Sequence, residues 1–254
     1  MTNYSKLMSK YWRFRRLLRE LPRMPHRRIQ AMRARHNRSI VEIIGVKFRL
    51  QSFFSLHLCE NILRERYETE ERALLIKWLE PEDIVMELGT GLGFLATLCA
   101  LRIGSDRVYT FEANPNLSNV IEETFSLNSV NPHFETLMLG PEKGIAKFYL
   151  GQEFNASSNQ RTSAAIQTIE VPMESFNERV REIEPSVLIC DIEGGECELF
   201  EYAEVPTVRK LLIELHPTKI GIEKIRETVE TIKAAGFNRE DGSDKVMLFR
   251  RDAG

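Results

Sequence analysis

The chain has 254 residues, of which 43% are hydrophobic, 35 are lysine or arginine and 37 are aspartate or glutamate. This length allows one large domain with a full core, and the composition is too apolar for a disordered chain. No apolar run approaches the roughly 20 residues of a membrane-spanning helix, and the basic N-terminus lacks the apolar stretch of a secretory signal.

The net charge of −2 is the average of two unlike parts. Residues 1–40 contain 12 lysines and arginines and one acid, Glu20, which gives a local net charge of +11. The other 214 residues contain 23 bases and 36 acids, which gives a local net charge of −13. Such asymmetry is typical of a basic arm attached to an acidic body.

The arm, residues 1–38, is expected to be helical and amphipathic. Between residues 4 and 21 apolar side chains recur at spacings of three and four, with bases between them. Pro22 and Pro25 end this helix, and a second short helix is expected over 27–38. The arm suits a peripheral contact with anionic lipid or self-association with an acidic body, and nucleic acid is the less favoured partner. We therefore expect a cytoplasmic protein, with association at the inner membrane surface left open.

The rest of the chain predicts alternating strands and helices. A strand over 39–50 and helices over 53–63 and 68–79 lead into the core. From residue 81 onward we expect strands over 84–88, 107–112, 134–139, 187–191, 208–215 and 245–250, and helices over 94–101, 117–128, 175–183, 196–202 and 218–235. A strand pair over 145–150 and 165–171 flanks a polar loop at 151–163. This alternation predicts a mostly parallel sheet covered on both faces.

The four cysteines have no spacing typical of metal ligands. Cys59, Cys99, Cys190 and Cys197 form no CxxC pair, so we interpret them as buried apolar residues in a reducing compartment. No zinc site is predicted.

The strongest local motif is the glycine-rich turn at residues 87–93, Glu-Leu-Gly-Thr-Gly-Leu-Gly. It joins a first parallel strand to a helix, where glycines allow a ligand to approach the backbone closely. A dinucleotide site needs its third glycine one residue later, where Phe94 stands. Glu87 also suits a cofactor with a cationic amino-acid end better than a pyrophosphate. S-adenosylmethionine (SAM), with an ammonium, a sulfonium and no phosphate, fits this pattern.

A second acid follows the next strand. Glu112 stands about 20 residues past the glycines, where a carboxylate can accept hydrogen bonds from both ribose hydroxyls of a nucleoside. The predicted cofactor-binding residues are therefore Glu87, Gly89, Thr90, Gly91, Gly93, Glu112, Ala113, Asn114 and Asp191.

Together with three later motifs, these segments resemble the FkbM family of SAM-dependent methyltransferases. The resemblance covers about 65–251 and includes Tyr67-Glu68, residues 87–93 and 111–115, and residues 171–176. Most specific are residues 188–196, which contain the family's Asp-x-Glu-Gly-x-Glu pattern from Asp191 to Glu196, and residues 213–217. The loop departs from the family's usual Gly-Ala-Asn-x-Gly, Glu174 replaces an aspartate, and Leu139-Gly140 replaces a Ser-Asp-like pair beside the adenine. Residues 1–60 match no motif of the family.

The resemblance implies the fold and the activity. The expected fold is α/β, a Rossmann-like class I methyltransferase with a seven-stranded, mostly parallel sheet and an antiparallel last strand. The expected parts are the arm (1–38), a leading segment (39–80) and the SAM-dependent methyltransferase domain (81–254). The expected reaction is O-methylation of a sugar, a glycan or a secondary metabolite.

Three residues at strand ends are candidates for acid–base chemistry. Asp191 follows the fourth predicted parallel strand, and Glu214 and His216 end the fifth. A hydroxyl acceptor must lose its proton during methyl transfer, and side chains at the carboxyl ends of parallel strands face the ligand. Asp191 is expected nearest the transferred methyl group. Asp191 could instead cap the helix that begins near Glu196.

Two further interpretations stay open at this point. Asp191, Glu214 and His216 could together bind a divalent ion, although no metal ligand is predicted. The chain could also be a non-catalytic or membrane-peripheral binding module with this fold, or an RNA methyltransferase that uses its arm for backbone contacts.

Overall fold

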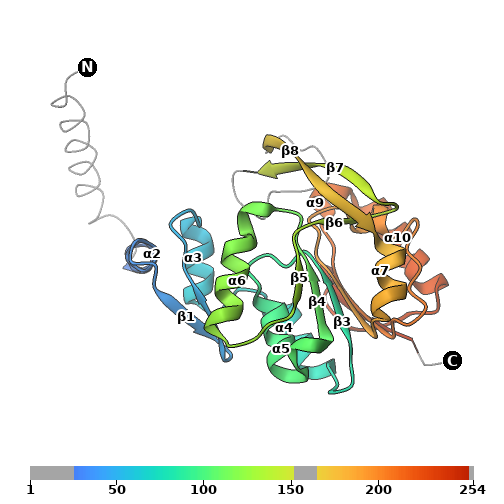
Figure 1. Cartoon of the computed structure of the whole chain (residues 1–254), viewed down its shortest axis with the longest axis horizontal. Helices are drawn as coiled ribbons and strands as arrows, with labels where there is room; N and C mark the ends of the chain where they lie inside the picture. Colours follow the sequence, from blue (N-terminus) through green and yellow to red (C-terminus); the bar gives the residue numbers. More distant parts are fainter. Residues whose placement is uncertain (1–25, 152–164, 252–254) are drawn as a thin grey trace. The chain divides into compact units, whose positions relative to one another are not determined.

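The computed structural model describes residues 26–151 and 165–251 (Figure 1). The chain forms two compact units. The smaller unit holds the described residues up to Val41 together with Leu50–Tyr67, and the larger one holds Glu42–Arg49 and the described residues from Glu68 onward. The helix predicted over 4–21 and nearly all of the loop predicted over 151–163 lie outside the described residues.

Two helices lie in the described part of the smaller unit. Helix α2 (His26–His36) packs against α3 (Leu56–Leu63), with Ala31, Cys59 and Ile62 buried. Ser55 caps α3, because its hydroxyl accepts a hydrogen bond from the Leu58 amide at 3.1 Å. Both helices were predicted from the sequence and are confirmed.

The prediction of a single strand over 39–50 is wrong, because the structure shows a two-stranded hairpin in this segment. Strand β1 (Ile40–Ile43) and strand β2 (Val46–Arg49) form a two-stranded sheet. Ile44 and Gly45 have φ angles of 46° and 86°, and two consecutive left-handed residues reverse the chain. The run of apolar residues continues through the turn and therefore hides it. Phe48 of β2 lies edge-on against Phe94, with ring centres 5.9 Å apart.

The larger unit is built on a seven-stranded sheet with the order β11-β12-β10-β9-β3-β4-β5. Its strands are β3 (Val85–Leu88), β4 (Val108–Phe111), β5 (His133–Glu135), β9 (Val187–Cys190), β10 (Lys210–Glu214), β11 (Asn238–Gly242) and β12 (Val246–Arg250). Strands β3, β4, β5, β9 and β10 are parallel, and β12 runs antiparallel to β10. The predicted sheet with an antiparallel last strand is confirmed.

Helices cover both faces of this sheet. Figure 1 shows α4 (Thr69–Trp78), α5 (Phe94–Ile103) and α6 (Ser118–Leu127) on one face, and α7 (Phe176–Ile183) and α10 (Ile222–Ala234) on the other. Strands β3 and β9 are buried along their whole length, as expected for strands covered on both sides. The core against α7 and α10 includes Leu88, Leu188, Leu211, Phe176, Phe237 and Phe249. All four cysteines are buried and free, as predicted.

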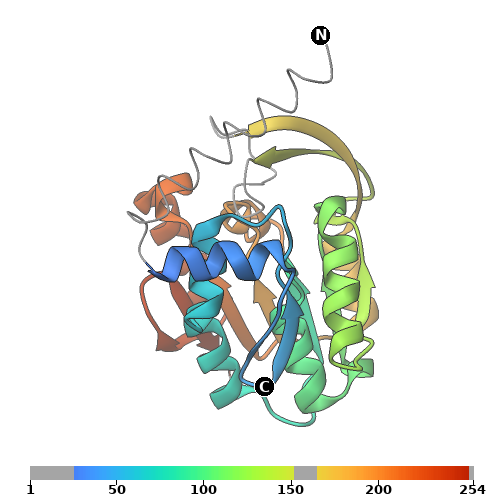
Figure 2. The ribbon, with the colours of Figure 1, turned by 90° about the vertical axis from the view of Figure 1, so that its left-hand side faces the viewer.

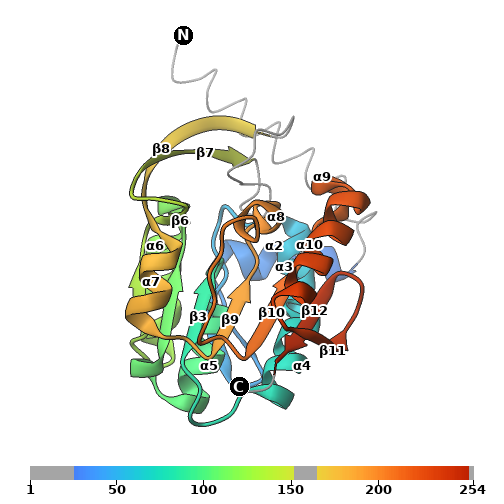
Figure 3. The same ribbon diagram turned by 90° about the vertical axis from the view of Figure 1, so that its right-hand side faces the viewer.

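The prediction of one strand over 134–139 is also wrong, because the structure has two strands there that belong to different sheets. Strand β5 pairs with β4, whereas β6 (Met138–Gly140) pairs with β8 (Ala165–Ser175). Strand β8 also pairs with β7 (Gly144–Gly151) in the predicted antiparallel pair. One continuous apolar stretch therefore serves two sheets. In Figures 2 and 3 strands β7 and β8 arch at the end of the larger unit where α8 (Glu196–Leu199) and α9 (Pro217–Ile220) lie.

The helix predicted over 218–235 is broken in two. Helix α9 ends at Ile220 and α10 begins at Ile222, because Gly221 between them has a φ of 92°. This backbone conformation interrupts a right-handed helix, and glycine adopts it without steric cost. Helix α8 is also shorter than the predicted 196–202. None of the helices in the described ranges is both long and apolar enough to cross a membrane.

Candidate active site

The predicted site residues lie where four parallel strands end. Strands β3, β4, β9 and β10 point the same way, so their carboxyl ends meet at one edge of the sheet (Figure 3). The glycine loop follows β3, Glu112 follows β4, Asp191 follows β9, and Glu214 and His216 end β10. The fold therefore brings together segments that are more than 100 residues apart in the chain.

The glycine loop uses its backbone amides inside the protein. The amides of Gly89 and Thr90 donate to the Phe111 carbonyl at 2.9 and 3.3 Å, and the Gly93 amide donates to Thr90 at 2.9 Å. The Gly91 amide donates to Oε2 of Glu112 at 3.0 Å. A pyrophosphate needs free amide donors at this position. Since these four amides are already engaged, the loop is poorly suited to a dinucleotide.

Glu87 lies beneath this loop and supports it. Its side chain is 1% exposed and accepts a hydrogen bond from the Thr110 hydroxyl at 2.5 Å, and Thr110 in turn contacts the Thr90 hydroxyl at 2.5 Å. Burial raises the pKa of Glu87 to about 8, against the opposing effect of the Thr110 hydrogen bond. The structure thus shows Glu87 as a support of the loop. Its contact with a cofactor ammonium stays a prediction.

Glu112 joins the loop to the end of β4. Its Oε1 accepts from the Asn114 amide at 2.8 Å, while Oε2 accepts from Gly91. Burial raises the pKa of Glu112 to about 7, although the amides of Asn114, Gly91 and Ala113 lower it. Each carboxylate oxygen has a second lone pair that could accept from a ligand hydroxyl. Glu112 therefore fits the predicted contact with a ribose.

Two of the loop glycines are required by close packing. Gly89 has a φ of 87°, and a Cβ there would lie 1.7 Å from the Asp191 carbonyl oxygen. Gly93 has a φ of 79°, and a Cβ there would press on Phe125 and Ile121 of α6. The Gly89 backbone thus touches the residue predicted to lie nearest the methyl group. This contact ties the loop after β3 to the end of β9.

His216 lies at the centre of a group of carboxylates. Its Nε2 is 3.3 Å from Glu193, 3.5 Å from Glu214 and 3.7 Å from Asp191, and its Nδ1 is 3.1 Å from Glu196. Burial lowers the pKa of His216, but its hydrogen bond to the Glu196 carboxylate and the surrounding negative charges outweigh burial and raise it above its usual value. We call these five residues the His216 cluster.

Asp191 and Glu193 face the same point. Glu193 has a φ of 55°, and its carboxylate lies within 4.8 Å of the ligand atoms of Asp191 and His216. The Oδ1 atom of Asp191 is buried without a hydrogen-bond partner among the described residues. Burial, with the charges of Glu214 and Glu193, raises the pKa of Asp191 well above its usual value. Asp191 therefore combines an oxygen that has no hydrogen-bond partner among the described residues with an increased affinity for a proton.

The structure gives Glu196 a supporting role. Its fully buried carboxylate accepts hydrogen bonds from the Ile192 and Gly194 amides at 3.0–3.1 Å, so it holds the turn after β9. The alternative role of Asp191 as a helix cap is not found, because Gly195 is the cap residue of α8 and no side chain caps that helix. Glu196 also fixes His216, which the sequence alone did not indicate.

Glu214 is held by a second set of charges that sequence reasoning missed. Its carboxylate forms an ion pair with Lys245 of the turn before β12. It also lies beside Glu71 of α4, where burial and the nearby Glu214 raise the pKa of Glu71 to about 7. Glu68, Glu71 and Glu214 bring carboxylate oxygens within 4.8 Å of one another. The Tyr67-Glu68 motif was the one sequence signal for this group.

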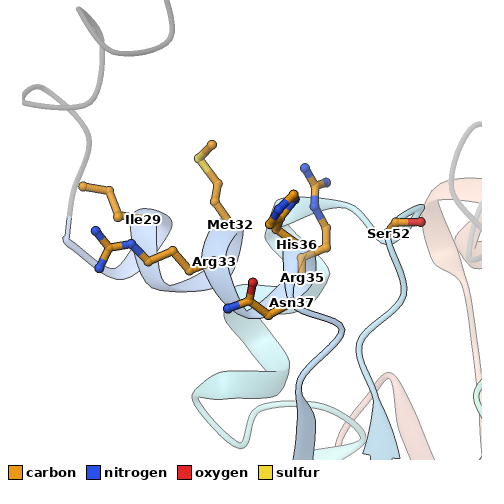
Figure 4. Close-up of a pocket in the computed structure, with 7 residues that line it drawn as sticks. All are labelled: Ile29, Met32, Arg33, Arg35, His36, Asn37 and Ser52. Carbon is orange, nitrogen blue, oxygen red and sulfur yellow. The ribbon is translucent and has the colours of Figure 1, made fainter. Parts of the chain in front are cut away.

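A separate hollow lies in the smaller unit (Figure 4). It is lined by one face of α2 and its end, with Ile29, Met32, Arg33, Arg35, His36, Asn37 and Ser52. Its lining contains bases and no acid, in contrast to the carboxylate-rich sheet edge. Arg35 also donates to the Phe54 carbonyl at 2.8 Å, which fixes part of this surface.

Several solved structures are similar to the chain at low identity. A precorrin-6y C5,15-methyltransferase from Geobacter metallireducens is 11% identical, with a TM-score of 0.42 over 71% of this chain and 87% of that one. A putative transferase from Pyrococcus horikoshii is 15% identical, with a TM-score of 0.45 over 83% and 69%. A putative tRNA (m1A22) methyltransferase from Streptococcus pneumoniae is 8% identical, with a TM-score of 0.44 over 72% and 70%.

No curated protein matches the chain. The model of the methyltransferase FkbM domain matches residues 86–239, which is more than half of the chain. This match begins in β3 and ends in β11, so it contains the glycine loop, Glu112 and the whole His216 cluster. It agrees with the resemblance found in the sequence motifs and with the Rossmann-like sheet, and the chain belongs to the FkbM methyltransferase family.

Proposed function

We propose that the protein is a SAM-dependent O-methyltransferase that acts on a hydroxyl of a sugar, a glycan or a secondary metabolite. The observation that carries the proposal is the meeting of the glycine loop, Glu112 and Asp191 at one sheet edge, where Oδ1 of Asp191 has no hydrogen-bond partner among the described residues. Membership of the FkbM family supports methyl transfer. A hydroxyl acceptor fits the acid–base side chains at this edge, and the sugar, glycan or secondary-metabolite class is what the family resemblance implies.

The residues around the loop fit SAM better than a phosphate-bearing cofactor. Four loop amides are bonded within the protein, and the side chains nearest the loop, Glu87 and Glu112, offer acceptors. Acceptors suit the ribose hydroxyls and the ammonium of SAM, whereas they repel a pyrophosphate. When bound, SAM supplies a methyl group on a positively charged sulfur. Glu112 would hold the ribose, and Gly89 would let the chain pass close to the cofactor and Asp191.

Methyl transfer to a hydroxyl requires alignment and the removal of one proton. In the proposed reaction the acceptor oxygen would form a bond to the methyl carbon that SAM supplies, and the electron pair of the broken carbon–sulfur bond would stay on sulfur. The acceptor proton would pass to Oδ1 of Asp191, which has no hydrogen-bond partner among the described residues and whose pKa is raised by burial and by the neighbouring carboxylates. Holding the two reactants in line lowers the activation barrier, and strand ends fixed in one sheet can provide that positioning.

The proposal is tested by transfer of a trideuterated methyl group from labelled SAM into a cell extract, with mass analysis of the products. We expect one trideuteromethyl group on an oxygen of a small or glycan acceptor, with wild-type protein and not with Asp191→Asn. A label found on nitrogen or carbon, or only in material destroyed by ribonuclease, would contradict the proposed acceptor. Absence of any labelled product would contradict the proposed activity.

A further inference from the structure

The His216 cluster has the arrangement of a metal site. Asp191, Glu193 and His216 each offer one ligand atom, and these atoms all lie within 4.8 Å of one another. They come from three different segments: the end of β9, the turn after it and the end of β10. Glu214 brings a further oxygen within 3.5 Å of His216 Nε2. One nitrogen and several carboxylate oxygens therefore converge on one point.

The orientation of His216 supports a ligand role. Its Nδ1 lies 3.1 Å from the carboxylate of Glu196, which is itself fixed by two backbone amides and fully buried. This hydrogen bond places the proton on Nδ1 of the neutral ring and leaves the lone pair on Nε2. Nε2 then points at the carboxylates of Asp191, Glu193 and Glu214, which are acceptors as well. A carboxylate behind the ring is the usual partner of a histidine that binds a metal through its other nitrogen.

The environment of Asp191 Oδ1 and the excess of carboxylates in the His216 cluster also support a metal site. The His216 side chain is 9% exposed, and the buried Oδ1 of Asp191 has no hydrogen-bond partner among the described residues. Four carboxylates of the cluster face two lysines, Lys219 on Glu193 and Lys245 on Glu214. Among the described residues, four carboxylates therefore surround one imidazole and only two lysines contact them. Burying such charges is costly unless they are paired or coordinate a metal.

We propose that Asp191, Glu193 and His216 bind a divalent cation of the manganese or magnesium class, with Glu214 completing the site. Carboxylate oxygens suit Mn²⁺ and Mg²⁺, and the single imidazole favours Mn²⁺ of the two. The catalytic use of this cation rests on the proposed O-methyl transfer: a hydroxyl bound to it becomes more acidic and gives up its proton more easily to a carboxylate oxygen that does not hold the cation. Cation binding itself is independent of that reaction.

The competing arrangement is a protonated His216 that pairs with the same carboxylates and needs no metal. The two arrangements differ in a measurable way, because a protonated imidazole cannot donate a lone pair. Mn²⁺ bound at the His216 cluster must therefore be coupled to an imidazole nitrogen. Mn²⁺ bound at the nearby all-carboxylate group of Glu68, Glu71 and Glu214 cannot be.

The test is a titration of the full-length protein with Mn²⁺, followed by electron paramagnetic resonance, with electron spin-echo modulation to detect nitrogen coupling. We expect one saturable Mn²⁺ with ¹⁴N coupling in the wild type. Glu193→Gln and His216→Gln should weaken its binding by about tenfold or more, and His216→Gln should remove the nitrogen coupling. Glu223→Gln, at an exposed carboxylate of α10, serves as the matched control and should leave both signals unchanged.

Three outcomes would overturn the proposal: no saturable site, a site without nitrogen coupling in the wild type, or a site that survives both cluster variants. The ¹⁴N coupling of Mn²⁺ bound to the wild-type protein tests the proposed ligand His216 even if a variant does not fold. Calorimetry with SAM on the same samples separates this result from the proposed function. If the wild type binds SAM but not Mn²⁺, only the proposed metal site is contradicted. If the wild type does not bind SAM, the proposed methyltransferase activity is contradicted.

Discussion

At the scale of single residues, the carboxyl edge of the sheet is dominated by buried acids. Glu87, Glu112 and Asp191 all have a raised pKa, and burial is the first cause in each case. Perturbed carboxyl groups gathered at one sheet edge are typical of functional sites. Each of these acids is therefore expected to respond to a ligand that carries positive charge or hydroxyl donors.

Asp191→Asn tests the role assigned to the unpartnered oxygen. The variant cannot accept the acceptor proton, so we expect the rate of methyl transfer to fall by about 10²–10⁴-fold. The affinity for SAM should change by only a few-fold, because the amide has nearly the same shape. Single-turnover transfer and calorimetric SAM binding measure the two effects separately. Near-wild-type turnover would remove Asp191 from the chemistry.

Glu112→Gln tests the ribose contact through its pH dependence. The pKa of Glu112 is about 7, and ribose hydroxyls prefer the ionised carboxylate, so SAM binding must displace a proton below that pH. We expect SAM to bind the wild type roughly tenfold more weakly at pH 6 than at pH 8, with little further gain above pH 8. Calorimetry across this range should show a flatter profile for Glu112→Gln. An unchanged slope in the variant would assign the dependence to another group.

The sequence predicted the sheet edge at which the candidate residues lie, but not how they are held or that Glu193 and Glu196 join them. Motifs and strand ends placed Asp191, Glu214 and His216 at one edge, because parallel strands end together. The link from His216 to Glu196 and the ion pair between Glu214 and Lys245 depend on tertiary contacts across 20 and 31 residues. Neither contact joins residues at a helix or strand spacing, so no local sequence pattern predicts it.

At the scale of elements, the connection between the glycine loop and β9 organises the site. Gly89 packs against the Asp191 carbonyl, so the glycine loop lies directly on the residue proposed as the proton acceptor. Any side chain at residue 89 would separate them. The glycine loop, proposed to bind the cofactor, and the end of β9, which bears Asp191, thus contact each other through backbone atoms.

Gly89→Ala is expected to destabilise the protein more than Gly236→Ala. Both glycines have a φ near 90°, so both substitutions introduce an unfavourable conformation that costs about 1–2 kcal/mol. A Cβ at Gly236 meets nothing within 4 Å, whereas one at Gly89 meets a backbone oxygen at 1.7 Å. Urea unfolding should therefore show a clearly larger loss for Gly89→Ala. Equal losses would contradict the close packing of the loop on β9.

The elements that the sequence predicted correctly are those with a clear period and a clear end. The buried strands β3 and β9 and the capped helix α3 are examples. The errors at residues 39–50, 134–139 and 218–235 share one cause. In each segment an apolar pattern runs through a break that is set by backbone geometry, at Ile44, between β5 and β6, and at Gly221. Hydrophobic periodicity does not record such breaks.

At the scale of the whole molecule, the charge is divided between a basic N-terminal part and an acidic remainder. The family match begins at residue 86, so the basic part lies outside it. Helix α2 shows that some of these bases belong to an ordered element, because Ala31 is buried against its surroundings. A deletion that tests the arm should therefore end at residue 25 and leave α2 intact.

Deletion of residues 1–25 tests the predicted peripheral contact of the arm. If the arm binds anionic lipid, the full chain should float with vesicles that contain phosphatidylserine, and the shortened chain should not. Neither form should float with neutral vesicles, and added salt should release the full chain. SAM binding should be the same in both forms. Equal partitioning of both forms would refute an anchoring role.

Binding of the cofactor is the claim on which the account depends most. Calorimetry of the purified full-length protein with SAM, and with its demethylated product, measures it directly. The account predicts one saturable site for each compound, with affinity that falls in Glu112→Gln and stays in the exposed control Glu223→Gln. No heat of binding with either compound, from protein that is folded by circular dichroism, would contradict it.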